Sequence, residues 1–143
     1  MKKQLLLIAT LAGLSSQAFA HGEDAPGPHG GHIRMPGAFH TELSLDEKTQ
    51  DLHVYLIDME FKNPTVKESK LEAVAKRGKS SVKFTCSVMD GNHFHCVPEK
   101  KYPLKGEIIL NATRENAVGN EAVYKLPLMK FKGGKKSEGH QHH

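Results

Sequence analysis

Hydrophobic and polar residues alternate along the chain from residue 38 onward, with the period of two that a half-buried β-strand produces. One alternating run covers residues 38–45, and a second covers 52–58 after a polar turn. Pairing these runs as antiparallel neighbours places His53 opposite Ser44. The pattern predicts two strands, with His53 as a solvated strand residue.

The clearest pattern is a hairpin at residues 81–98. Apolar residues alternate on both sides of the sequence Asp-Gly-Asn at 90–92, which is a typical turn. With these three residues as the loop, Cys86 faces Cys96 and the apolar residues of both strands share one face. A slip of one residue would spoil both matches, so the sequence predicts a disulfide across this hairpin.

Three weaker segments complete the predicted domain. Residues 107–113 and 122–128 alternate like strands, and Pro127 marks an edge or a strand end. Residues 70–76 fit either a strand or a helical turn. Six or seven short strands within residues 38–130 predict an all-β fold, an antiparallel immunoglobulin-like β-sandwich, with a small β-barrel as the alternative.

The two ends of the chain differ from this domain. Residues 1–20 have two lysines, a short apolar run and the sequence Ala-Phe-Ala, which together are typical of a signal peptide. Cleavage after Ala20 would leave a periplasmic or secreted protein that begins at His21 and has no integral membrane segment. Residues 21–37 are predicted to be a flexible arm rich in His, Gly and Pro, and residues 131–143 a flexible tail.

Composition and charge exclude several classes of function. The 143 residues include ten histidines and no tryptophan, and the formal charge falls from +4 to +2 once the signal peptide is removed. So small an excess of positive charge predicts no nucleic-acid partner. The chain shows no catalytic motif, and we expect no enzymatic activity. Two cysteines in an exported chain favour a disulfide over a metal site.

The histidines are candidate metal ligands, because neutral imidazole binds Cu(II), Zn(II) and Ni(II). An N-terminal histidine can hold copper through its amine and its ring together. The predicted metal ligands of the arm and the first strand are His21, His29, His32, His40 and Glu42. The secondary candidates lie on the hairpin face opposite the cysteines and are His93, His95 and Met89. The tail residues His140, His142 and His143 are expected to bind metal only weakly.

Three short segments carry a resemblance to a known family. They are Gly-Pro-His-Gly-Gly at 27–31, Gly-Ala-Phe-His-Thr-Glu-Leu at 37–43 and Val-Tyr-Leu-Ile-Asp at 54–58. This pattern resembles periplasmic metal-associated domains, which also occur at the start of adaptor subunits of heavy-metal efflux systems. The resemblance covers roughly 30 residues. It implies a β-sandwich and a metal-handling role, with His29, His40 and Glu42 at the matching positions.

These observations predict a periplasmic protein that binds a transition metal, copper first and zinc second, for buffering, delivery or resistance. A heavy-metal efflux system is the partner that the resemblance implies. The alternative is a secreted structural or interaction module whose histidines have no metal role.

Overall fold

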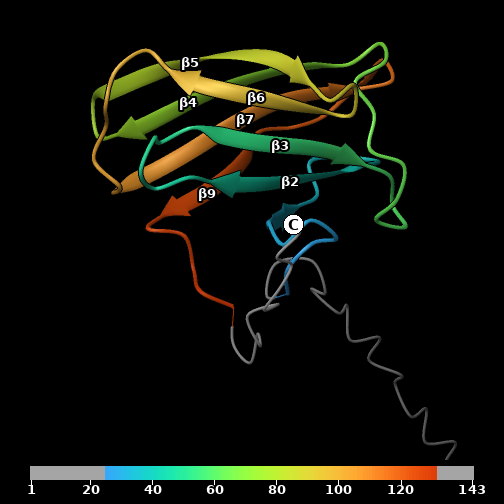
Figure 1. Ribbon diagram of the computed structural model, residues 1–143, viewed down its shortest axis with the longest axis horizontal. Helices are drawn as coiled ribbons and strands as arrows, with labels where there is room; N and C mark the ends of the chain where they lie inside the picture. The colour runs from blue at the N-terminus through green and yellow to red at the C-terminus, as the bar shows by residue number, and fades with distance from the viewer. Residues whose placement is uncertain (1–24, 132–143) are drawn as a thin grey trace, which may run out of the picture.

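The computed structural model describes residues 25–131, which form nine β-strands and no helix (Figure 1). All strand pairs are antiparallel, and the hydrogen-bonded order is β1-β2-β3-β6-β5-β4-β7-β8. Strand β9 also pairs with β7, on the same edge as β8 and opposite β4. The strands are β1 (His32–Arg34), β2 (His40–Leu45), β3 (Leu52–Ile57), β4 (Lys70–Arg77), β5 (Ser80–Met89), β6 (His93–Pro98), β7 (Gly106–Arg114), β8 (Ala117–Val118) and β9 (Ala122–Leu126).

The β5–β6 hairpin has the predicted register. Cys86 lies opposite Cys96, and a disulfide of 2.06 Å joins them. In the β2–β3 pair, Ser44 lies opposite His53, which is also the predicted pairing. Both registers place the apolar residues of the two strands on the same, inner face.

The sheet almost closes on itself. The first part of the ten-residue strand β5 pairs with β4, and its second part pairs with β6, so β5 connects the two halves of the sheet. The remaining gap lies between β1 and β9, where Arg34 Nε donates to the carbonyl oxygen of Val123 at 2.9 Å. This nearly closed path is nearer to the small barrel of the two predicted folds than to two separate sheets.

Side chains from all the long strands fill the interior. Tyr124 and Phe39 are the largest fully buried groups, and the Tyr124 hydroxyl contacts the Thr41 hydroxyl at 2.6 Å. The inner residues of β7, Ile108 and Leu110, are fully buried as the alternation requires. No helix within residues 25–131 has the length and apolar character needed to cross a membrane.

The structure corrects two boundaries and decides one open assignment. The predicted arm is not entirely without secondary structure, because residues 32–34 form β1 and pair with β2. Residues 70–77 form a strand, since β7 lies beside them and buries Leu71 and Ala73. The predicted last strand ends at Leu126, just before Pro127. The predicted signal peptide, His21 and almost all of the tail lie outside the described residues.

Candidate functional site

Histidines gather on the outer face of β3 and β6. Strand β3 pairs with β6 so that His53 lies opposite His95, and residues directly opposite in an antiparallel pair point to the same side. His93, two residues before His95, points to that side as well. We call this surface the histidine face and define it by His53, His93 and His95.

Buried Glu42 of β2 fixes a loop at the edge of the histidine face. The side chain of Glu42 is fully buried, and its carboxylate accepts three hydrogen bonds from the loop at residues 27–31. The backbone N–H groups of His29 and Gly31 donate to Oε2 at 2.7 and 2.9 Å. The ring Nδ1 of His29 lies 2.8 Å from Oε1. A buried carboxylate needs such donors, so the loop satisfies Glu42 and is held by it.

Two glycines permit this close approach. A Cβ atom on Gly27 would lie 2.5 Å from the Glu42 carboxyl carbon, and one on Gly31 would lie 2.9 Å from its Cγ. Neither contact is sterically possible without a shift of the loop or of Glu42. Gly30 adopts a φ of 79°, which favours glycine. The segment Gly-Pro-His-Gly-Gly and Glu42 therefore form one packed unit.

Aromatic stacking connects this loop to the histidine face. The ring of His29 stacks on Tyr55 of β3, with centroids 3.7 Å apart and planes within 5° of parallel. Tyr55 also stacks with His93 at 4.4 Å. His53 then stacks with His95 at 4.8 Å. The rings thus continue from the loop across β3 to β6.

The closest nitrogen atoms on this surface belong to His53 and His93. Nδ1 of His53 lies 3.0 Å from Nε2 of His93. The other ring nitrogen of His93, Nδ1, lies 2.7 Å from Oδ1 of Asn92. Because that amide oxygen can only accept, it fixes the proton of His93 on Nδ1 and leaves a lone pair on Nε2, which accepts a hydrogen bond from Nδ1–H of His53.

His95 has a similar arrangement at the other end of the histidine face. Its Nε2 lies 2.8 Å from Oδ2 of Asp51, in the turn before β3. The carboxylate holds the proton on Nε2 and leaves a lone pair on Nδ1. Oxygen acceptors that orient histidines in this way commonly surround metal sites, where they fix the tautomer of each ligand.

Burial affects the protonation of the central groups. It lowers the pKa of His93, and the charges of neighbouring His53 and His95 lower this pKa further, whereas the charge of Asp90 opposes them. The pKa of Tyr55 is raised by its burial and then by the negative charge of Glu42. His93 therefore favours the neutral form that binds metals, and Tyr55 keeps its proton.

The spacing of the two nitrogens fits a shared ion. A metal–nitrogen distance of about 2.0–2.1 Å places two ligand nitrogens about 2.9 Å apart at a right angle and about 3.3 Å apart in a tetrahedron. The 3.0 Å between His53 and His93 lies within this range. Across residues 25–131, however, no group of three or more His, Cys, Asp or Glu side chains is arranged to hold one ion. The preorganised set is thus a pair.

The predicted ligands of the arm and the first strand do not meet at one point. His32 lies opposite Leu43 in the β1–β2 pair, away from Glu42, and its ring stacks on Phe131 at 4.4 Å. His40 is buried, stacks on Phe61 at 4.2 Å and has an Nδ1 without a hydrogen-bond partner.

His29 and Glu42 do come together, but they bond to each other. Of the secondary candidates, Met89 lies opposite His93 in the β5–β6 pair, as predicted.

Sequence reasoning missed His53, Tyr55 and Asp51 as parts of this surface. The interpretation of His53 as a solvated residue is wrong, because its ring is partly buried between His93 and His95. The alternation of residues in β3 correctly places His53 on the outer face of the sheet. The contact of His53 with His93 and His95 arises because β3 lies beside β6, and no local sequence pattern indicates that these two strands are neighbours.

No protein-family model, curated protein or solved structure matches this chain significantly. The resemblance to periplasmic metal-associated domains therefore remains a prediction.

Proposed function

We propose that this protein binds a transition-metal ion, copper first and zinc second, at the histidine face. The observation that carries this proposal is the pair of ring nitrogens of His53 and His93, 3.0 Å apart. One of the two rings is already oriented by an oxygen acceptor, Asn92 Oδ1. An ion bound between the two rings would replace the hydrogen that they now share, and His53 would then carry its proton on Nε2. The two nitrogens already have the spacing of metal ligands, which reduces the cost of binding.

Further ligands are available around this pair. His95 stacks on His53, and Met89 lies on the strand opposite His93. Imidazole suits Cu(II) and Zn(II), and thioether favours Cu(I). For nitrogen ligands the divalent series places Cu(II) above Zn(II), so copper is the tighter ion.

The proposed role is buffering, delivery or resistance in the periplasm. The disulfide between Cys86 and Cys96 fits an oxidising compartment. His93 is buried, whereas His53 and His95 are partly exposed, so an ion held here can be reached from the surface for uptake and release. Delivery to a heavy-metal efflux system is the partner role that this proposal includes.

Calorimetric titration of the untagged, chelator-treated protein with Cu(II) and Zn(II) tests the proposal. We expect one tight Cu(II) site. His53→Gln and His93→Gln should each weaken it at least about ten-fold, or about 1.4 kcal/mol, because each removes one ligand of the pair.

The matched control is His32→Gln, which changes a histidine on the other side of the sheet and should leave the affinity unchanged. Circular dichroism checks that each variant keeps its strands. No tight Cu(II) binding, or equal affinity in all three variants, would contradict the proposal and favour an interaction module without a metal.

A further inference from the structure

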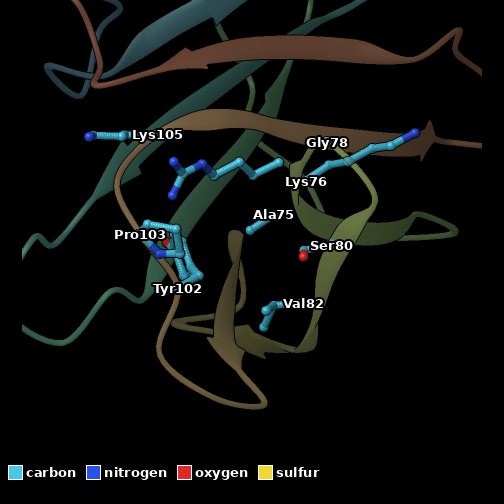
Figure 2. A pocket seen from close by; sticks show the side chains of 9 residues that line it. Ala75, Lys76, Gly78, Ser80, Val82, Tyr102, Pro103 and Lys105 are labelled. Atoms are coloured by element: carbon cyan, nitrogen blue, oxygen red, sulfur yellow. The ribbon is translucent and has the colours of Figure 1, made fainter.

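A cavity of about 350 Å³ lies between the β4–β5 turn and the connection from β6 to β7 (Figure 2). Its inner wall is apolar and consists of Ala75, Val82 and Tyr102, all of which are buried members of the core. In Figure 2 the short side chains of Ala75 and Val82 point toward the hollow, and Tyr102 closes one side. The volume is at the lower end of the range for small-molecule sites.

The wall is held in place before any ligand binds. Gln50 of the β2–β3 turn donates to the Tyr102 carbonyl oxygen at 2.6 Å and accepts from its N–H at 3.0 Å. The Tyr102 hydroxyl donates to the Gln50 carbonyl oxygen at 3.0 Å. Gly106 adopts a φ of 90°, and a Cβ there would lie 2.3 Å from the Lys76 carbonyl oxygen. The connection therefore approaches β4 closely, and the cavity is preformed.

The rim of the cavity is positively charged. Lys76, Arg77 and Lys105 line it, and no acidic side chain does. Within residues 25–131 none of the three has an ion pair or a side-chain hydrogen bond. The other two arginines, Arg34 and Arg114, donate to backbone carbonyl oxygens. Arg77 is thus the arginine whose planar group is available to a ligand.

We propose that this cavity binds a small organic carboxylate, with its apolar body against Ala75, Val82 and Tyr102 and its carboxylate at Arg77. Arginine binds carboxylates with two parallel hydrogen bonds, which a neutral ligand cannot accept in the same way. The ammonium groups of Lys76 and Lys105 extend away from the hollow in opposite directions in Figure 2, so Arg77 is the positive group placed to meet the carboxylate. An apolar body without an anion, or an anion without an apolar body, would use only half of the site.

Titration of the chelator-treated protein with hexanoate, followed by amide chemical shifts in NMR spectra, tests this proposal without involving a metal. Hexanoate should shift amide signals around the cavity, from residues 75–82 and 102–105. Hexanol and acetate are the two half-ligands and should each bind at least about ten-fold more weakly.

Arg77→Gln should weaken hexanoate binding at least about ten-fold, because it removes the guanidinium group and leaves the apolar wall of the cavity unchanged. Lys67→Gln is the matched control, since Lys67 lies in the β3–β4 connection and does not line the cavity. Arg77 is exposed, so its replacement should not affect folding. Hexanoate shifts located elsewhere, or equal affinity in Arg77→Gln, would overturn the proposal.

Discussion

The loop at residues 27–31 and the histidine face both contain histidine next to carboxylate, but they use their polar atoms differently. In the loop, the ring and backbone of His29 bond to buried Glu42, which satisfies a fully buried carboxylate. On the histidine face, oxygen acceptors engage one nitrogen of His93 and one of His95, and the second nitrogen of His93 bonds to another imidazole, His53, whose place an ion can take. The comparison shows that the number of ligand-type residues does not define a metal site. What matters is which of their donor atoms remain available.

The largest expected effect is on the loop. Glu42→Ala should reduce the free energy of unfolding by about 3 kcal/mol, because it removes the acceptor of three hydrogen bonds. Urea unfolding measures this loss. Ser44→Ala, on the same face of β2, should change stability by less than about 0.5 kcal/mol. If Glu42→Ala is as stable as the original protein, the carboxylate is not what holds the loop.

The next effect is on the support beneath the histidine face. Replacing both Cys86 and Cys96 by alanine opens a loop with a sequence separation of 10 and should cost roughly 2.5–3 kcal/mol. Copper affinity should change less than about three-fold, because the pairing of β3 with β6 still places His53 opposite His95. Urea unfolding and copper titration of the same sample separate the two effects. A large loss of affinity would mean that the disulfide also shapes the site.

Copper titration then compares the two regions directly. His93→Gln should weaken Cu(II) at least about ten-fold, whereas His29→Gln should weaken it less than about three-fold. The reason is that Nδ1 of His29 is already bonded to Glu42, and its ring stacks on Tyr55. Similar losses in both variants would place the loop inside the metal site and remove the distinction between the regions.

Local pairings could be predicted from the sequence. Alternation on both sides of a short turn fixed the β5–β6 register, and the facing cysteines allowed only that register. The sequence of residues 70–77 fits either a strand or a helical turn, because lysine, glutamate and alanine also favour helices. The segment forms a strand because it pairs with β7, which buries Leu71.

The histidine face could not be predicted as a unit. His53 and His93 are 40 positions apart, and their contact depends on β3 and β6 being neighbours. That adjacency is set by how the whole sheet nearly closes, which no short segment encodes. The packing of the loop could not be predicted for a related reason. Its glycines are required by the close approach to Glu42, and this contact cannot be seen in the spacing of its histidines.

The smallest effect concerns His32, the histidine of β1 that lies away from both regions. Burial and then the charge of Arg34 lower the pKa of His32 in the folded protein. The unfolded chain therefore takes up this proton at a higher pH than the folded protein does. Stability should fall as pH drops below about 6.5 and should stop falling, for this group, below its folded pKa.

His32→Gln removes that contribution, so its free energy of unfolding should decline less than that of the original protein between pH 7 and pH 5. The difference should be small, because His32 is only partly buried and solvent screens its charge. Urea unfolding at several pH values measures it, with Ser44→Ala expected to keep the original slope. An unchanged slope in His32→Gln would show that this ring protonates equally in both states, leaving its stacking on Phe131 as its contribution to the fold.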